Sequence, residues 1–416
     1  MVPKGWSSVQ AQDVCKSISV GVVIKPTQYY VPEGYGVKAF RSANVREGFI
    51  NDSDWVYFSH EGHAINKKSH LKTGDVLIVR TGYPGTACVV TPEFEGSNAI
   101  DIVIARPDMD KIIPEYLCAY TNSHIGKSQV LDLQGGMAQK HLNVGAYQVL
   151  KINLPSLREQ KKIAQILLTW DNAISVTEKL LANSQRQKKA LMQQLLTGKK
   201  RLLDENGVRF STQWEFKRIS EIATRVQRKN DAAEHPILTI SSLSGFVRQD
   251  ERYSRYMAGE SVKNYILLKK GEFAYNKGNS KTYEFGCIFD LEAYETGLVP
   301  HVYVCFRLKN GLSHRYFKYL FEADYLKPQL GALVNTGVRN NGLLNIKPTE
   351  FMQTKVPVPC FEEQESIADM LYNSSRTIRV LQDKLACLKD EKKALMQQLL
   401  TGKRRVKVDA EEAVSA

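Results

Sequence analysis

The chain has 416 residues, which is too long for one ordinary domain and suits two to four. Hydrophobic residues make up 43% and charged residues 24%, as in globular proteins, and the net charge of +13 favours a polyanionic partner such as nucleic acid. No stretch of 18 apolar residues occurs and the first residues do not read as a signal peptide, which excludes a membrane-spanning helix and predicts a cytoplasmic protein.

Residues 1–154 predict a first domain with mixed α/β structure. Segments rich in β-formers lie at 75–80, 86–90 and 100–104, and a helical pattern follows at 114–133. Hairpins with glycine-containing connections followed by helices indicate an α+β fold.

Two loops of this domain carry side chains that suit DNA. Arg and Lys match guanine edges and phosphates, whereas Asn and Gln match adenine. The candidates are Arg80, Thr81 and Tyr83 after the first strand, and Gln134, Gln139, Lys140 and His141 after the helix. A solvated surface turn is the alternative for each loop.

Residues 155–203 predict a long helix. Pro155 suits a helix start because its missing N–H would be unpaired there, and Gly198 suits the C-cap. Seam residues recur in steps of four and three, as in a coiled coil. They are Ile163, Leu167, Trp170, Ile174, Thr177, Leu181, Ser184, Lys188, Leu191 and Leu195.

The second half repeats this plan. Residues 204–358 predict a second domain, with strands at 272–275, 287–289 and 302–306 and a helical pattern at 314–334. Residues 359–404 predict a second long helix, and 405–416 form a tail. The seam of that helix is Ile367, Leu371, Ser374, Ile378, Leu381, Leu385, Leu388, Lys392, Leu395 and Leu399. The loop candidates for DNA contact are Asn276, Lys277, Asn279, Ser280, Lys281, Tyr283, Arg339, Asn340 and Asn341.

Twelve residues occur twice without change: Lys-Lys-Ala-Leu-Met-Gln-Gln-Leu-Leu-Thr-Gly-Lys fills both 188–199 and 392–403. The sequences upstream diverge, so the constant segments are expected to meet one kind of partner twice and the variable domains two different targets. A pseudo-two-fold relation between the halves would make the two long helices antiparallel. The alternative is that the long helices only link the two domains and bind no partner. The docking candidates are Lys188, Lys189, Met192, Gln193, Gln194, Lys392, Lys393, Met396, Gln397 and Gln398.

No catalytic constellation is recognisable, so a binding protein is predicted. The segment at Gly126-Lys127-Ser128 is not a phosphate-binding loop, because Thr121 stands where that motif requires glycine. His60-Glu-Gly-His63 lacks the histidine spacing of a zinc protease. The seven cysteines are scattered with no Cys-x-x-Cys pair, which predicts free buried thiols rather than a metal site.

The sequence resembles the specificity subunits of type I restriction–modification systems. The resemblance covers nearly the whole chain. Its clearest parts are the entries into the long helices, Leu154-Pro-Ser-Leu-Arg-Glu-Gln160 and Val358-Pro-Cys-Phe-Glu-Glu-Gln364, and the two constant segments. Leu71-Lys-Thr-Gly-Asp-Val-Leu-Ile78 and Gly136-Met-Ala-Gln-Lys-His-Leu142 are similar to segments of the family's recognition domains. The second half departs from this pattern and reads Gly-Glu-Phe-Ala-Tyr-Asn at 271–276.

The resemblance implies two target-recognition domains, each reading one half of a bipartite double-stranded DNA target, and an antiparallel coiled coil that fixes the spacer. It implies two docked modification subunits that use S-adenosylmethionine, and two restriction subunits that use ATP and Mg²⁺. It implies no catalytic residue, metal or cofactor on this chain. The alternatives are a specificity module of a related two-component modification–cleavage enzyme, a self-sufficient DNA enzyme, and a coiled-coil scaffold without DNA binding.

Overall fold

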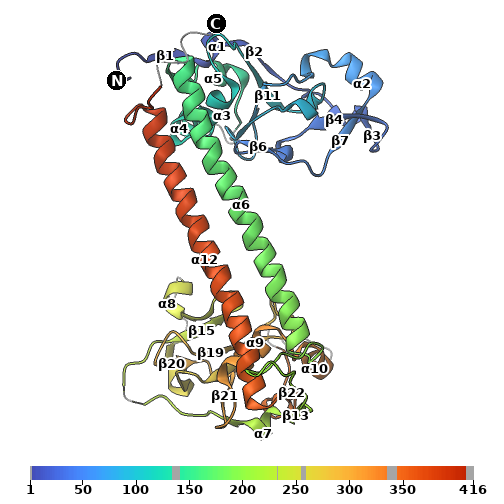
Figure 1. Ribbon diagram of the computed structural model, residues 1–416, viewed down its shortest axis with the longest axis vertical. Helices are drawn as coiled ribbons and strands as arrows, with labels where there is room; N and C mark the ends of the chain where they lie inside the picture. Colours follow the sequence, from blue (N-terminus) through green and yellow to red (C-terminus); the bar gives the residue numbers. More distant parts are fainter. Residues whose placement is uncertain (1, 134–140, 232, 254–258, 335–343, 409–416) are drawn as a thin grey trace. The chain divides into compact units, whose positions relative to one another are not determined.

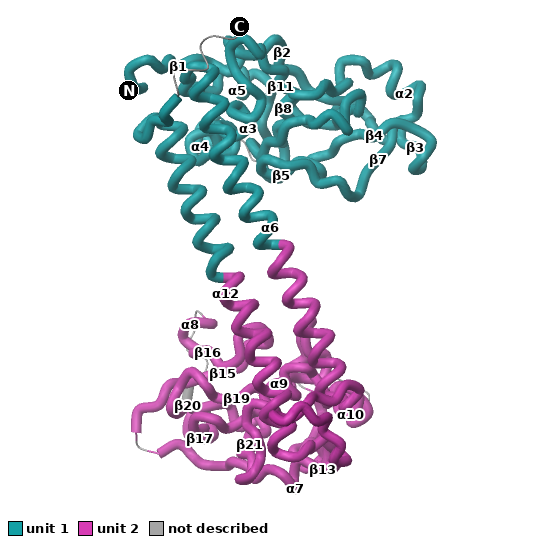
Figure 2. The backbone as a smooth tube through the Cα atoms, in the orientation of Figure 1, with its two compact units in different colours: residues 1–178, 383–416 teal, residues 179–382 magenta. Residues whose placement is uncertain are grey.

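The protein consists of two compact units, and the core of each contains both a β-sheet and helices (Figures 1 and 2). The structure is a computed structural model that describes residues 2–133, 141–231, 233–253, 259–334 and 344–408. Unit 1 contains residues 1–178 and 383–416, and unit 2 contains residues 179–382. Both long helices, α6 (Leu157–Leu195) and α12 (Phe361–Leu400), contribute to both units.

Unit 1 has a central antiparallel sheet with the strand order β2-β11-β8-β9. These strands span Cys15–Val20, Ile102–Pro107, Val76–Val79 and Ala87–Val89. Alternate residues of β8 serve different cores: Val76 and Ile78 pack toward the helices, whereas Leu77 and Val79 pack on the opposite face. The strands predicted at 75–80, 86–90 and 100–104 are therefore confirmed, with the third shifted toward residue 107.

The remaining elements of unit 1 complete two layers around this sheet. Strand β1 (Ser7–Gln10) pairs antiparallel with β12 (Lys151–Leu154), and β5 (Val45–Arg46) pairs with β6 (Phe49–Ile50). A second sheet has the order β10-β4-β7-β3. Its strands span Asn98–Ala99, Gly36–Phe40, Val56–Ser59 and Tyr30–Val31. The helices are α1 (Ala11–Val14), α2 (His60–Ile65), α3 (Pro114–Asn122), α4 (His124–Leu133) and α5 (Val144–Gln148).

Unit 2 repeats the central sheet with the order β14-β21-β18-β19. These strands span Ala223–Arg225, Val304–Leu308, Phe273–Asn276 and Cys287–Asp290. The segment 271–276, which departs from the first half in sequence, thus forms the strand that corresponds to β8. Gly74 and Gly271 precede the two strands at φ +86° and +80°, a conformation that glycine adopts without steric cost.

The other elements of unit 2 follow the same chain order. The strands are β13 (Glu215–Arg218) with β22 (Lys355–Val358), β15 (Leu238–Ser241) with β16 (Gly245–Arg248), and β17 (Ile266–Lys269) with β20 (Thr296–Val299). The helices are α7 (Ile219–Ile222), α8 (Gln249–Arg252), α9 (His314–Glu322), α10 (Lys327–Leu333) and α11 (Pro348–Met352).

Each helical pattern after the sheet is broken into two helices. In unit 1 the break lies at Ser123, and Gly126 in the first turn of α4 approaches the end of α3 closely, since a side chain there would meet the Tyr120 carbonyl oxygen at 2.3 Å. In unit 2 the break lies at Asp324, which has φ +55°. The predictions of helix at 114–133 and 314–334 were right in type but missed these turns.

The two long helices pair in antiparallel fashion within each unit. Every predicted seam residue is buried or half-buried, which confirms the heptad pattern. In unit 1 Ile163 and Leu167, near the start of α6, share a core with Leu399 and Leu400 at the end of α12. In unit 2 Leu195 and Leu196 at the end of α6 share a core with Ile367 and Leu371 near the start of α12.

A buried Glu-Gln pair fastens each long helix where it begins. Gln364 accepts a hydrogen bond from the Ser313 N–H at 2.9 Å and donates one to the Pro359 carbonyl at 2.8 Å. Glu363 accepts two hydrogen bonds from Arg201, at 2.6 and 2.7 Å, and one from the Trp214 indole at 2.8 Å. Because Arg201 follows α6, this Glu-Gln clamp joins the start of one helix to the end of the other.

Unit 1 contains the same clamp. Gln160 accepts from the Ile113 N–H and donates to the Lys111 and Pro155 carbonyls, each at 3.0 Å. Arg405, after α12, donates to Glu159 at 2.8 Å and lies over the Trp6 ring at 5.5 Å. Gly198 and Gly402 take φ +70° and +68°, and the bonds Lys200 N–H to Gln194 O and Arg404 N–H to Gln398 O close the helix ends, as predicted for C-caps.

Replacing Gln364 by Leu is predicted to destabilise unit 2 locally. The Ser313 N–H would lose its partner inside the core, and an unsatisfied buried donor costs about 1–3 kcal/mol. Hydrogen exchange followed by mass spectrometry should show the amides of α9 and the start of α12 exchanging about 5- to 150-fold faster, the range that corresponds to this cost. Gln397→Leu makes the same change at an exposed position of α12 and should leave these amides unchanged; equal effects of the two variants would contradict the assigned role.

Candidate nucleic-acid interface

The two candidate loops of unit 1 lie next to each other. The Leu142 N–H donates to the Arg80 carbonyl at 3.0 Å, and Thr81 forms a β-bridge with His141. The Thr81 hydroxyl also lies 2.9 Å from His141 Nδ1. The structure therefore brings together the turn after β8 and the segment after α4, which are about 60 residues apart in sequence.

Arg80 holds this arrangement in place and is not a free base-reading side chain. It is 9% exposed, its Nε donates to the Leu142 carbonyl at 3.0 Å, and its guanidinium also contacts Asp101 and His141. Its Nε and both terminal nitrogens each have a partner within the fold, so a direct guanine contact by Arg80 gains no support from this geometry. Asp101 itself sits in the left-handed region at φ +49°.

Three candidates of unit 1 are open to solvent. Tyr83 is 82% exposed, and Thr81 and His141 are also exposed. Glycines with φ +92° and +83°, at Gly82 and Gly85, flank Tyr83 and hold the turn away from the sheet. An exposed aromatic ring beside hydroxyl and imidazole groups suits stacking and hydrogen bonding to nucleic acid.

Unit 2 places the corresponding loop after β18. The Leu344 N–H donates to the Lys277 carbonyl at 3.1 Å, which is the counterpart of the Leu142–Arg80 bond. Asn276 accepts from the Gly278 N–H at 2.9 Å, and Asn279 and Lys281 are exposed. The same frame therefore presents Asn and Lys side chains where unit 1 presents Thr and Tyr.

Tyr283 belongs to the fold rather than to the surface of this loop. It is 8% exposed, its hydroxyl donates to the Glu322 carbonyl at 3.3 Å, and its N–H donates to Ser280 Oγ at 3.0 Å. Burial raises the pKa of Tyr283 to about 12, so the phenol remains a donor at neutral pH. Its hydroxyl is bound within the fold, and its contact with DNA stays a prediction.

A cavity of about 340 Å³ adjoins the loop of unit 2 and adds residues that sequence reasoning missed. Asn276, Asn279 and Ser280 line it together with Arg252 and Tyr303. Arg252 donates to the Ile240 carbonyl at 2.9 Å, which fixes the guanidinium at the edge of the cavity. No sequence signal identified it, because α8 lies more than twenty residues before the loop.

Six candidates lie outside the described residues. They are Gln134, Gln139, Lys140, Arg339, Asn340 and Asn341. The structure places the residues that flank both segments, His141 and Leu142 in unit 1 and Leu344 in unit 2, beside the strand loops described above.

The ten docking candidates divide into two sets. The exposed set is Lys189, Gln193, Gln194, Lys393, Gln397 and Gln398. The inward set is Lys188, Met192, Lys392 and Met396. Lys188 pairs with Glu322 and Lys392 with Asp171, while Met192 and Met396 pack in the cores. Packing thus explains why the inward residues of the two twelve-residue segments are identical, but it does not explain why their exposed residues are identical.

The cysteines of the protein are free thiols, and most of them are buried. All seven cysteines are free, and burial raises the pKa of Cys88, Cys287 and Cys305 to about 12, which suppresses the nucleophilic thiolate. Among residues that the structure describes, no three His, Cys, Asp or Glu side chains gather as a metal site would need. The described helices also include none long and apolar enough to cross a membrane.

Residues 3–183 match the family model of the type I restriction modification DNA specificity domain. The chain is 24% identical to the putative type I restriction enzyme MjaX specificity subunit of Methanocaldococcus jannaschii, over 98% of this chain and 95% of the relative. It is 25% identical to the MjaVIII specificity subunit of the same organism, over 98% and 94% of the two chains, and 23% identical to the EcoKI specificity subunit of Escherichia coli, over 88% and 81%.

Solved structures share the fold at low sequence identity. A chain from a structure of a type I restriction–modification system, described for its complex assembly and conformational transition, aligns over 97% of this chain and all of its own with a TM-score of 0.56 and 16% identity. The S subunit of a type I system from M. genitalium aligns over 96% of both chains with a TM-score of 0.55 and 12% identity.

Lys281→Ala is predicted to weaken binding to any DNA duplex. An exposed lysine that neutralises one phosphate contributes about one unit to the slope of log affinity against log salt, so the slope should fall by about one. Fluorescence anisotropy of a labelled duplex across a salt series measures it. Tyr283→Phe removes only the buried bond to Glu322 and should keep the slope while lowering stability by about 0.5–1.5 kcal/mol; an unchanged slope in Lys281→Ala would argue against a phosphate contact.

Proposed function

We propose that the chain is the DNA-recognition subunit of a type I restriction–modification system, and that its two units each read one half of a bipartite DNA target. In this proposal the loops after β8 and β18, with the segments after α4 and α10, make the base contacts. The paired helices set the unread spacer between the two half-sites.

The repeated frame with different loops is the observation that carries this proposal. Both units have the same order of central strands, and both tie the strand loop to the segment that follows the helices by one backbone bond, Leu142 to Arg80 and Leu344 to Lys277. At the tips of these frames the side chains differ: Thr81 and Tyr83 in one unit, and Asn279 and Lys281 in the other. Two domains with the same backbone arrangement and different loop side chains suit the recognition of two different short DNA sequences.

We propose that the exposed part of the repeated segment docks two modification subunits. Lys189, Gln193 and Gln194, with their copies Lys393, Gln397 and Gln398, are identical, exposed and without a role in either core. Two restriction subunits would join the same assembly. S-adenosylmethionine, ATP and Mg²⁺ would act on these partners, and this chain would catalyse no step itself and work in the cytoplasm, where the DNA is.

Replacing residues 1–154 with the corresponding domain of another family member is predicted to change one half-site only. β1 and β12 pair at the two ends of the exchanged segment, and unit 2 (residues 179–382) lies outside it, so the exchange keeps the second reader intact. Mapping of methylated positions in a genome that carries the hybrid measures the outcome. A change in both half-sites would refute the assignment of one unit to one half-site.

Lys189→Glu and Lys393→Glu are each predicted to weaken one of two docking positions about tenfold, and the double variant to weaken both. The charge is reversed at an exposed position, so the fold should persist. Native mass spectrometry of the full chain with its modification subunits measures how many bind. Lys384→Glu reverses an exposed lysine of α12 outside the repeated segment and should still bind two; loss of binding in this control as well would point to a general charge effect.

A further inference from the structure

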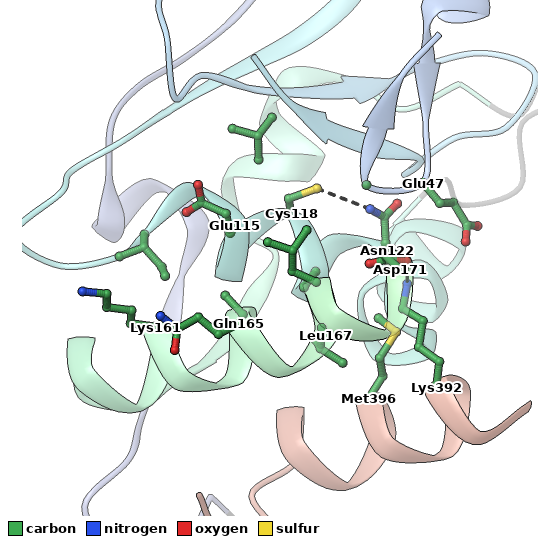
Figure 3. A pocket seen from close by; sticks show the side chains of 16 residues that line it. Glu47, Glu115, Cys118, Asn122, Lys161, Gln165, Leu167, Asp171, Lys392 and Met396 are labelled. Atoms are coloured by element: carbon green, nitrogen blue, oxygen red, sulfur yellow. Dashed lines mark hydrogen bonds and ion pairs between the residues drawn. The ribbon is translucent and has the colours of Figure 1, made fainter. Parts of the chain in front are cut away.

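Unit 1 contains a cavity of about 370 Å³ between α3, α6 and the C-terminal part of α12 (Figure 3). Ala119, Ala164, Leu167 and Met396 form a small or apolar part of its wall, and the rest includes polar side chains such as Glu115, Lys161 and Gln165. Asp171 and Lys392, which form an ion pair, lie at its edge, as Figure 3 shows. Leu168 also lines it and is 57% exposed, so the cavity opens to solvent.

The internal repeat identifies the counterpart of each wall residue in unit 2. The Ile113 N–H binds Gln160, as the Ser313 N–H binds Gln364. The Tyr116 hydroxyl donates to the Asn153 carbonyl at 2.6 Å, as the Tyr316 hydroxyl donates to the Pro357 carbonyl at 3.3 Å. Helices α3 and α9 therefore correspond residue by residue, and Ala119 corresponds to Tyr319.

In unit 2 the side chain of Tyr319 lies in the core that contains the counterparts of these wall residues. Tyr319 is 6% exposed and belongs to the core that contains Met192, Ala368 and Leu371, the counterparts of Met396, Ala164 and Leu167. Lys188, the counterpart of Lys392, places its ammonium 5.3 Å from the centre of the Tyr319 ring.

The polar end of Tyr319 also has a counterpart in unit 1. Burial raises the pKa of Tyr319, and a hydrogen bond to Ser375 opposes that shift. Ser375 occupies the position that corresponds to Asp171, at the same step in the second long helix. The cavity of unit 1 thus offers a cation for a ring face and a carboxylate that can accept a hydrogen bond from a phenol.

We propose that the cavity of unit 1 receives a tyrosine side chain from the modification subunit that docks beside it. The identity of the partner as a modification subunit rests on the proposed function. The preference of the cavity for a phenol ring is inferred from unit 2 alone. The ring would pack on Ala164, Leu167 and Met396, whose counterparts share a core with Tyr319. Its hydroxyl would donate to Asp171, with Lys392 over the ring.

The two docking positions then differ although their exposed sequences are identical. At unit 2 the aromatic ring is supplied by the chain itself, and at unit 1 it must come from the partner. The modification subunit at unit 1 gains a buried contact that its copy at unit 2 lacks, so the first subunit to bind would occupy unit 1.

The cavity is tested with 4-methylphenol, which is the tyrosine side chain as a free molecule, on the full chain. Saturation-transfer NMR should show binding to the wild type and its loss in Ala119→Tyr, which supplies the missing ring as unit 2 does. Ala119→Leu fills part of the same space with little change of surface and should also lose binding. Tyr319→Ala opens the counterpart and should bind a second equivalent. Binding of 4-methylphenol to Ala119→Tyr and Ala119→Leu as strong as to the wild type would overturn the proposal.

Titration with the modification subunit, followed by native mass spectrometry, tests the partner. The wild type should show two unequal affinities, and Ala119→Tyr should lose about tenfold at the tighter site and make the two sites equal. Two equal sites in the wild type would overturn the tyrosine contact. If the wild type binds 4-methylphenol but no modification subunit, the proposed docking and the assigned partner are both wrong. That outcome differs from loss of 4-methylphenol binding, which would contradict the cavity itself.

Discussion

The Glu-Gln clamp at the start of each long helix is the contact on which both units depend. Glu363 is nearly fully buried, and a buried carboxylate is tolerated only when it is paired and hydrogen-bonded. Arg201 and Trp214 supply that pairing, and Arg201 comes from just beyond the other long helix. The clamp therefore specifies antiparallel helix pairing, because no parallel arrangement would bring the end of α6 to the start of α12 within unit 2.

The parts of the fold that follow from periodicity were predictable from sequence. The heptad seam, the C-cap glycines and six of the eight strands of the central sheets were identified, because each leaves a regular pattern of apolar residues or glycine; strands β2 and β14 were missed. The turns at Ser123 and Asp324 were missed, since a continuous helical pattern runs through both. The second sheet of unit 1 was missed as well, since strands such as β3 and β10 are only two residues long.

The candidate interface was predictable in position but not in detail. The loops after β8 and β18 were located from their place between strands, yet the roles of Arg80 and Tyr283 depend on partners 20 to 60 residues away in sequence, Asp101, Leu142 and Glu322. Residue type alone does not tell an arginine that holds a loop from one that reads a base. The division of the twelve-residue repeat into packed and exposed faces likewise required the helix environment.

Unit 1 is assembled from both ends of the described chain, whereas unit 2 is one continuous segment. During synthesis on the ribosome, unit 2 has all of its residues by position 382. Unit 1 must wait for Leu399 and Leu400 to cover Ile163 and Leu167, and for Arg405 to reach Glu159. A chain that stops early therefore leaves Ile163 and Leu167 of α6 without their cover and Glu159 without its cation.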